Sequence, residues 1–500
     1  MSVVGDIIAR SRVVEHHRPW TRAIVDADTW EGVIDVLADG TLSLLSLWGE
    51  PGWAHAAVMA AGGGQPLVLS LACPGGRYPS VGARHPPAIR LERALFDLYG
   101  LIPDGALDRR PWLDHGRWDV RQPLGANAPA DSREPYRFVT SEGESLHQIA
   151  VGPVHAGIIE PGHFRFAANG ETVVRLEARL GYLHRGVVAR MAGLAPQEAA
   201  RFAARACGDS TVAYSTAFAH AVEAALEVAA PPRAQALRGV MAEMERLANH
   251  LGDIGAICND AAFALMHAHC GVLREQVLRA AAAVFSHRLM MDSITPGGVA
   301  VDLGPDDLRI LRDLIALVRD RFPPLVSLYD DTASLQDRTV GTGWVAPHLA
   351  RQFAAGGYVG RASSRVFDAR QTVPYAPYDT LGVEACVREA GDVNARVWVR
   401  IDEVDQSLTL IERLLDGLPE GPARTDLPKG SGEGLALVEG FRGDVLAWVR
   451  VMEGRVERCH LRDPSWFQWP LLEACIEGNI VADFPLCNKS FNCAYAGVDL

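Results

Sequence analysis

The sequence predicts an α+β protein, in which a small α+β N-terminal domain precedes a larger, mainly helical domain with flanking β-elements. Three observations lead to this prediction. Before residue 100, short apolar runs are separated by turn residues, a pattern typical of strands. From Pro196 onward, alanine- and leucine-rich segments show helical spacing. Between these regions, residues 122–134 have no apolar periodicity.

The N-terminal part contains signals for both strands and helices. Residues 34–45 and 56–61 are each predicted to contribute to a strand, and residues 66–72 form an apolar run typical of a buried strand. Residues 87–98 are predicted to form a helix that ends at Gly100, because glycine readily adopts the left-handed conformation that closes a helix.

A linker is predicted between two folding units. Residues 122–134 are rich in Pro, Ala and small polar residues, a composition typical of linkers. A chain of 500 residues is also too long to fold around one hydrophobic core of ordinary size. We therefore expect a domain at residues 1–125, an exposed linker at 126–144 and a second, separately folding domain at 145–500.

The second domain is predicted to be built on a helical bundle. Residues 146–175 favour strands around turns, whereas residues 235–251, 272–291 and 305–328 favour long helices. In the first of these helices, apolar residues recur on one face. Several long helices in sequence are typical of a bundle.

The composition and motif content of the chain argue against several classes of function. The formal net charge of −13 argues against nucleic-acid binding, which needs a basic surface. No apolar run approaches the roughly 20 residues that span a bilayer, and no secretory signal is recognisable, so we expect a cytoplasmic chain. Nine scattered cysteines without a Cys-x-x-Cys pair predict reduced thiols and no metal cluster of the chain's own. No dinucleotide motif is present, so NAD binding is expected only elsewhere in a larger complex.

One string in the N-terminal part resembles part of complex I. Residues 91–100 read LERALFDLYG, and Asp-Arg-Arg at 108–110 and Trp118 follow. They resemble the small hydrophilic, 30-kDa-type protein of complex I, its C subunit, which bacteria often fuse ahead of the quinone-site D subunit. Ala94 stands where that family usually has an acidic residue. The resemblance implies that residues 1–125 are a domain of this 30-kDa type.

Further strings resemble hydrogenase and complex I subunits. They are GPVHAGIIEPGHFRF at residues 152–166, GYLHRG at 181–186 and RACGDS at 205–210, and similar strings continue in order to EGFRGD at 439–444 and beyond. Together they resemble the large subunit of membrane-bound nickel-iron hydrogenases of the formate hydrogenlyase type. They are also similar to its sister, the D subunit of complex I, which helps to build the quinone cavity.

The resemblance implies four positions for nickel-ligating thiolates, and one of them holds a cysteine. Cys207 is followed by Ser210 where the hydrogenases have a second cysteine, and Ala494 and Gly497 take the positions of the C-terminal pair. A one-residue shift would make Cys493 a candidate without completing the site. Serine is a hard donor that stays protonated near neutral pH, whereas such nickel sites need soft thiolates. We expect no nickel-iron centre and no cofactor firmly bound by this chain.

The quinone features of the complex I relatives are also incomplete. Gly208 stands where those relatives have the tyrosine that contacts the quinone headgroup. From their C-terminal Glu-Val-Asp-Arg, the acidic residue Asp499 is kept, but the Glu and the Arg are not. Tyr214 and Tyr495 are alternative sources of a phenol.

The resemblance also implies catalytic residues. Glu160, His163 and Arg165 are predicted to act in a redox cavity, because the hydrogenase glutamate of this loop is a proton-transfer candidate. The Ile-Ile-Glu-Pro context predicts that Glu160 is partly buried with a raised pKa, as a proton-relay carboxylate would be.

His155, His184, Arg185 and Asp499 are predicted to line the same quinone-like cavity. Simpler interpretations remain open for several of these residues. Histidines in a loop are often solvated, and an adjacent His-Arg pair often binds structural carboxylates. Cys207, predicted to lie on an alanine-rich helix, is open to interpretation as a small buried hydrophobic residue.

The expected function is that of a peripheral subunit on the cytoplasmic face of the inner membrane. It belongs to an oxidoreductase complex related to NADH-quinone oxidoreductase and energy-converting hydrogenase, and it is not active alone. An iron–sulfur small subunit, similar to the B subunit of complex I, is expected to carry the cluster and to dock at residues 160–165 and Cys207. Membrane subunits of the proton-pumping type are further partners, and quinone is a candidate substrate. The alternatives are a non-catalytic scaffold and an active nickel-iron hydrogenase.

Overall fold

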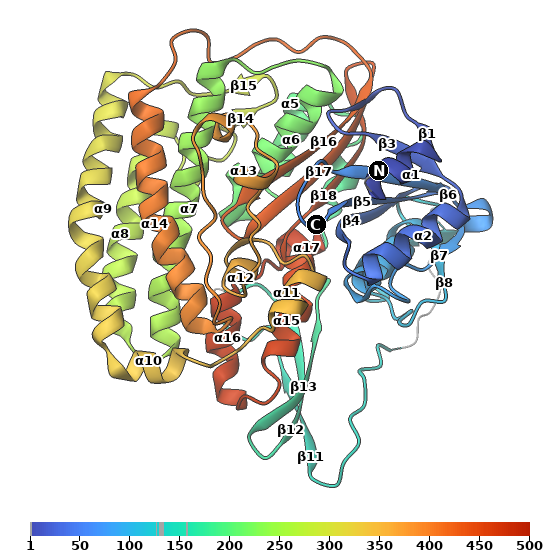
Figure 1. The fold of residues 1–500 in the computed structure, drawn as a ribbon, viewed down its shortest axis with the longest axis horizontal. Coiled ribbons are helices and arrows are strands. Elements are labelled where there is room, and N and C mark those ends of the chain that lie inside the picture. Colours follow the sequence, from blue (N-terminus) through green and yellow to red (C-terminus); the bar gives the residue numbers. More distant parts are fainter. Residues whose placement is uncertain (1–2, 127, 130–134, 157–158) are drawn as a thin grey trace.

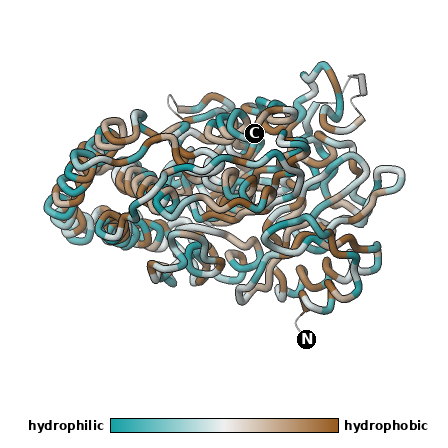
Figure 2. Tube along the Cα trace, turned by 90° about the horizontal axis from the view of Figure 1, so that it is seen from above, coloured by the Kyte–Doolittle hydropathy of each residue, from teal (hydrophilic) through white to brown (hydrophobic). Residues whose placement is uncertain are grey.

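The computed structural model describes residues 3–126, 128–129, 135–156 and 159–500. Figure 1 shows long helices on one side, strands in the centre, the N-terminal part on the other side and an arm that extends below. Seen from above, the long helices alternate between hydrophilic and hydrophobic residues, as expected for amphipathic helices (Figure 2). None of the described helices is long and apolar enough to cross a membrane. The predicted α+β fold class is confirmed.

The N-terminal part is a five-stranded sheet with helices packed against it. Its strand order is β1-β3-β6-β5-β4, in which β3 and β6 are parallel. The strands predicted at 56–61 and 66–72 are confirmed as β5 and β6, and the helix predicted at 87–98 is α3, with Gly100 left-handed at its C-cap. The elements are α1 (Val3–Ala9), β1 (Arg12–Val13), β3 (Arg22–Val25), α2 (Ala27–Ala38), β4 (Leu42–Glu50), β5 (Trp53–Ala60), β6 (Leu67–Ala72), β7 (Arg77–Pro79), α3 (Ile89–Tyr99) and β8 (Ile102–Asp104).

The strand predicted from residues 34–45 is wrong in its first half. The helix α2 continues to Ala38, and its N-cap Asp26 accepts a hydrogen bond from the backbone N–H of Thr29 at 2.9 Å. Val33 and Leu37, four residues apart, are both buried on one face of this helix. The strand β4 therefore begins only at Leu42.

Four long helices form the predicted bundle at the side of the molecule away from the N-terminal part (Figure 1). They are α7 (Pro232–Asp260), α8 (Ala264–Phe285), α9 (Pro305–Asp331) and α14 (Val393–Asp416). The helices predicted at 235–251 and 305–328 are confirmed. The helix predicted at 272–291 ends early, because Ser286 adopts a left-handed conformation after Phe285.

A four-stranded sheet connects the two parts of the chain. Its order is β18-β17-β16-β2, and the N-terminal strand β2 (His17–Arg18) pairs in parallel with β16. Trp48 of β4 packs on Trp448 of β17, with 5.9 Å between ring centroids. Arg450 binds Glu50 at 2.6 Å across the same boundary. The strands of the C-terminal part are β16 (Gly432–Gly440), β17 (Gly443–Met452) and β18 (Arg455–Arg462).

The arm is an antiparallel sheet of three strands, which confirms the strands predicted within residues 146–175. They are β11 (Leu146–Val151), β12 (His163–Asn169) and β13 (Thr172–Arg179). Shorter elements complete the second part: α4 (Val187–Met191), α5 (Pro196–Ala203), α6 (Thr211–Ala225), β14 (Ile294–Thr295), β15 (Gly298–Val299), α10 (Ala333–Thr339), α11 (Pro347–Gln352), α12 (Gly357–Arg361), α13 (Ala369–Thr372), α15 (Ser465–Cys475), α16 (Phe484–Phe491) and α17 (Ala496–Asp499).

The predicted division into 1–125, 126–144 and 145–500 stays a prediction. Residues 127 and 130–134 of the predicted linker lie outside the described residues. The following segment is fixed to the arm, since the Tyr136 hydroxyl donates to the Glu177 carboxylate at 2.8 Å. The structure adds that the two parts share a sheet and a buried core.

Candidate functional site

The first predicted thiolate pair lies just before α6. Cys207 has an extended backbone and is followed by a single 3-10 turn, so the expectation that it lies on a helix is wrong. Cys207 and Ser210 are 5% and 3% exposed. Burial raises the pKa of the Cys207 thiol well above its ordinary value, and the neighbouring Asp209 carboxylate raises it further. Cys207 is therefore a neutral thiol, and its Sγ lies 2.9 Å from Oδ1 of Asp209.

A buried guanidinium contacts both members of this pair. Arg442, between β16 and β17, places Nη1 2.7 Å from Oδ1 of Asp209, 3.0 Å from Oγ of Ser210 and 3.6 Å from Sγ of Cys207. Burial raises the pKa of Asp209 and the Arg442 cation lowers it, leaving a pKa of about 2. Asp209 and Arg442 therefore form an ion pair beside the thiol.

The second predicted pair lies at the start of α17. Ala494 is buried, and its carbonyl accepts a hydrogen bond from Nε1 of Trp469 at 3.0 Å. Beside Gly497, the Tyr214 hydroxyl donates to Oδ2 of Asp463 at 2.8 Å. A Cβ atom at position 497 would collide with this carboxylate and lie 2.9 Å from the Tyr214 hydroxyl. A cysteine at 497 therefore requires displacement of the Tyr214–Asp463 pair.

The side chains at these four positions do not fit a nickel-iron centre. Cys207 supplies the one thiol among them, and a buried cation contacts it where a metal ion would need a thiolate. Burial also raises the pKa of Cys493, whose Sγ lies 4.0 Å from the side-chain oxygen of Gln468. Within the part of the chain that the structure describes, no three His, Cys, Asp or Glu side chains are grouped to hold a metal ion.

The predicted catalytic residues lie where the arm meets α17. Glu160 is exposed, and its Oε2 accepts a hydrogen bond from the backbone N–H of Ala496 at 2.9 Å. Its expected partial burial is wrong, because the carboxylate binds the first turn of α17 from the solvent side. His163 and Arg165 lie on β12, and the Arg165 guanidinium stands over the ring of Phe138 at 4.6 Å. Burial lowers the pKa of His163.

His155 and Tyr495 face each other beside Glu160. Their ring centroids are 6.2 Å apart, and the edge of the Tyr495 ring packs on Trp469 at 4.9 Å. Tyr495 is 5% exposed, and burial raises the pKa of its phenol. The structure therefore brings together two predicted residues, Glu160 and His155, and one of the two alternative phenols. The other phenol, Tyr214, is bound to Asp463.

The remaining predicted cavity residues hold the C-terminal segment. The buried Asp499 carboxylate accepts two backbone hydrogen bonds from residues 181–183, each 2.9 Å long, and burial raises its pKa to about 7. His184 donates from Nδ1 to the Asp499 carbonyl at 2.7 Å. The Arg185 guanidinium donates to the carbonyls of residues 205–206, ahead of Cys207. Among the residues that the structure describes, Arg185 thus binds backbone carbonyls and no structural carboxylate.

A buried network of ion pairs lies behind the site. The sequence analysis predicted no role for its residues, although several of them lie in the strings that resemble hydrogenase and complex I subunits. Arg246 donates hydrogen bonds to the carbonyls of Glu439 and Gly440, each 3.1 Å long, three and two residues before Arg442. Burial raises the pKa of Glu439 to about 7. The network consists of residues at most 1% exposed: Glu243, Arg246, His250, Arg361, Asp368, Arg370, Glu403 and Glu439.

Two family models match the second part of the chain. The model of the 49-kDa subunit of respiratory-chain NADH dehydrogenase matches residues 253–431, and the nickel-dependent hydrogenase model matches residues 185–252. Formate hydrogenlyase subunit 5 of Escherichia coli K12 is 33% identical over 439 residues, spanning 84% of this chain and 77% of that protein. The chain belongs to the family of hydrogenase large subunits and complex I 49-kDa subunits.

Other members of the hydrogenase and 49-kDa family support this assignment. The C/D subunit of NADH-quinone oxidoreductase from Bacteroides thetaiotaomicron is 27% identical over 383 residues, spanning 71% of this chain and 72% of that protein. A chain in the structure of the membrane-bound sulfane sulfur reductase, an archaeal respiratory membrane complex, matches with a TM-score of 0.68 and 26% identity. It covers 72% of this chain and 100% of its own length. The predicted family is confirmed, whereas the roles of individual site residues stay predictions.

Proposed function

We propose that this chain forms a nickel-free redox cavity in a membrane-associated oxidoreductase complex. The observation that carries this proposal is the position of Arg442, which pairs with Asp209 and contacts both Cys207 and Ser210. The fixed positive charge of Arg442 disfavours binding of a divalent metal ion at the same point. The single protonated thiol of Cys207 is also a poor ligand set for nickel.

Proton delivery is proposed to occur at Glu160, His155 and Tyr495. A surface carboxylate, an imidazole and a buried phenol are groups that hold and pass protons during reduction of a bound substrate. Glu160 contacts the backbone of the residue that follows Tyr495, so the three groups adjoin one another. His163 and Arg165, which the sequence predicts as catalytic residues, are assigned positioning and docking roles on β12 in this proposal.

We infer that residues 160–165 and the surface beside Cys207 receive an iron–sulfur small subunit, which holds the cluster that supplies electrons. The names of the relatives place them in multi-subunit membrane complexes, which supports membrane subunits as further partners. The proposed location is peripheral, on the cytoplasmic face of the membrane.

The electron acceptor is not determined by the fold. The names of the relatives include formate hydrogenlyase, NADH-quinone oxidoreductase and sulfane sulfur reductase, so one fold serves different reactions. Quinone remains our candidate substrate, with Tyr495 as the phenol of the cavity.

Two substitutions in the purified complex test the site. Glu160→Gln keeps the hydrogen bond to Ala496 but removes the titratable proton, so it should slow turnover about 10- to 100-fold and leave assembly intact. Arg165→Ala removes a charge on the proposed docking surface, so it should weaken assembly instead. Arg279→Ala is the matched control, because Arg279 on α8 is 69% exposed and far along the bundle. If all three variants assemble and turn over like the parent complex, the redox-site proposal fails.

The second candidate function is a non-catalytic scaffold. Three of the four nickel-ligand positions lack a cysteine, and Gly208 lacks the quinone-contacting phenol, which favours this alternative. A scaffold predicts normal assembly and unchanged turnover in Glu160→Gln. The third alternative, an active nickel-iron hydrogenase, predicts hydrogen uptake, which needs thiolates that these positions do not provide.

A further inference from the structure

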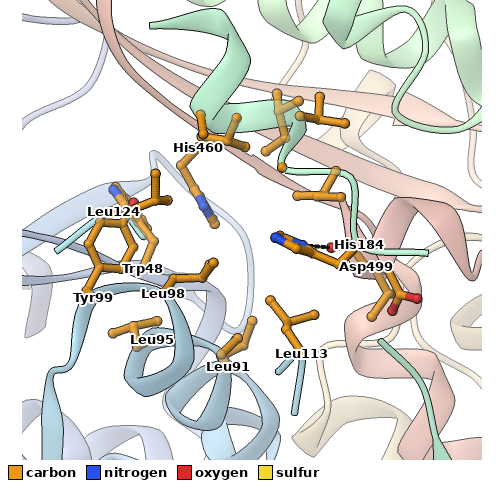
Figure 3. A pocket seen from close by; sticks show the side chains of 18 of the residues that line it. Trp48, Leu91, Leu95, Leu98, Tyr99, Leu113, Leu124, His184, His460 and Asp499 are labelled. Atoms are coloured by element: carbon orange, nitrogen blue, oxygen red, sulfur yellow. Dashed lines mark hydrogen bonds between the residues drawn. The ribbon is translucent and has the colours of Figure 1, made fainter. Parts of the chain in front are cut away.

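A cavity of about 140 Å³ lies between the N-terminal part and the C-terminal segment. One wall is the inner face of α3, with Leu91, Ala94 and Leu95. The opposite walls come from α4, from β18 and from the chain end at Val498–Leu500. Figure 3 shows leucine side chains directed into the cavity from below and the two histidines above them.

The cavity is mainly apolar, and its polar lining residues include Tyr99, Asp499 and a pair of imidazoles. His460 stacks on Trp48 with 4.9 Å between ring centroids, and its Nε2 lies 2.7 Å from Oγ of Ser46. His184 binds the Asp499 carbonyl through Nδ1. Figure 3 shows the two rings directed toward each other from opposite walls. Within the described residues, Nδ1 of His460 and Nε2 of His184 make no hydrogen bond, so each can serve a ligand.

Both imidazoles are uncharged at neutral pH. Burial lowers the pKa of His460 to about 3 and also lowers the pKa of His184. A neutral imidazole both donates and accepts hydrogen bonds, and it offers no countercharge to an ionic ligand. A carboxylate would therefore enter at a large desolvation cost, whereas a carbonyl or hydroxyl group finds a partner.

The size of the cavity sets the size of its ligand. An engineered cavity of about 150 Å³ in another protein is large enough for benzene. Leu124 and Val188 line the cavity and are partly exposed, so we place its opening to solvent, the mouth, beside them. An apolar pocket with few convergent polar groups is the usual form of a small-molecule site.

We propose that this cavity binds a neutral molecule the size of one six-membered ring, with either a hydroxyl group that bridges His184 and His460 or a carbonyl oxygen that accepts a hydrogen bond from Nδ1 of His460. The apolar face of the ligand packs on Leu91, Ala94 and Leu95. No covalent step is involved. Because His184 also binds α17, occupancy of the cavity stabilises the C-terminal segment that carries Asp499.

Thermal unfolding of the full chain with small probes tests this site. Phenol and cyclohexanone should raise Tm saturably, by about 2–4 °C at a concentration near 100 times Kd. Toluene should bind more weakly, and benzoate should produce no shift. Val188→Phe blocks the mouth and should abolish the shift, whereas Val36→Phe, the same change at a half-buried position of α2, should leave it intact.

His460→Phe tests the proposed hydrogen bond between His460 and the ligand oxygen, because it keeps a ring stacked on Trp48 but removes the ring nitrogens. The affinity of this variant for phenol and cyclohexanone should fall about 3- to 10-fold, and its affinity for toluene should not change. Equal shifts in the wild type and in Val188→Phe would show binding elsewhere and overturn the proposal. Absence of any shift with phenol and cyclohexanone in the wild type would overturn it as well.

Discussion

Arg442 places a positive charge beside Cys207 and Ser210, the first pair of predicted nickel-ligand positions. Its guanidinium is 4% exposed, while the Asp209 side chain is 35% exposed. Solvent therefore screens part of the pair, although the cation itself is buried. The thiol of Cys207 accepts a hydrogen bond from this cation and still keeps a raised pKa, because burial and Asp209 oppose the charged form.

Removing the cation should destabilise the chain. We predict that Arg442→Met lowers the free energy of unfolding by about 1–3 kcal/mol, because Asp209 loses its partner and Ser210 loses a donor. Thermal or urea unfolding of the purified chain measures this loss. Arg205→Met is the control, since its ion pair with Asp292 is largely exposed and should contribute less than about 1 kcal/mol. Equal losses in the two variants would contradict a special role for Arg442.

Glu245 should make stability depend on pH. It is 6% exposed, and it accepts backbone hydrogen bonds from Val212 and Ala213 at 2.7 and 3.2 Å. Burial raises its pKa from an ordinary 4.5 to about 8. Between these values the folded chain binds more protons than the unfolded chain, so the contribution of Glu245 to stability is lost as pH rises from 4.5 through 8.

We predict that Glu245→Gln flattens this dependence and is more stable than the wild type at pH 8 by about 1–3 kcal/mol. Glutamine has no charge to bury, and its side-chain oxygen can accept one of the two backbone hydrogen bonds. Melting temperatures of both chains between pH 5 and pH 9 provide the measurement. Parallel curves across this range would show that Glu245 does not titrate as proposed.

The sequence predicted candidate positions for the site but not their contacts. The motif strings predicted Cys207, Ser210 and Glu160 as such positions. They could not show that Arg442 reaches Asp209, because 233 residues separate the two in sequence. A local sequence pattern also could not predict that Glu160 is exposed, because its burial depends on how the arm packs against α17.

At the scale of elements, periodicity predicted the helices and strands that have one buried face or a clear terminator. The helix α3 with its Gly100 cap and the bundle helix α7 are examples. The sheet at residues 432–462 was missed because it is buried on both faces. Leu435 and Leu437 pack toward the N-terminal sheet, while Ala436 and Val438 pack toward α6. Such strands lack the alternation that marks a half-buried strand.

The shared core predicts that the two parts stay together after cleavage. Protease should first cut within the predicted linker, residues 126–144, yet the fragments should co-elute on size exclusion. Trp448→Ala removes a large side chain from the shared core and should cost about 3–5 kcal/mol and weaken the association. Trp344→Ala, at a 55% exposed tryptophan, is the control. Separation of the wild-type fragments after cleavage would instead favour independently folding domains.

At the scale of the whole molecule, family membership and site chemistry give different information. The match to formate hydrogenlyase subunit 5 establishes the fold over most of the chain. The residues at the predicted nickel-ligand positions are expected to decide the chemistry, because the fold alone hosts different reactions. Here an arginine–aspartate pair and a tyrosine–aspartate pair take the place of soft donors.

Metal analysis of the intact complex, purified from its native membrane and assayed for hydrogen uptake, tests the absence of nickel most directly. We predict no stoichiometric nickel in the complex, no hydrogen uptake, and iron that belongs to the iron–sulfur partner. About one nickel per chain together with hydrogen uptake would contradict the proposed role of Arg442 and show that the positions at 207, 210, 494 and 497 form a working metal site.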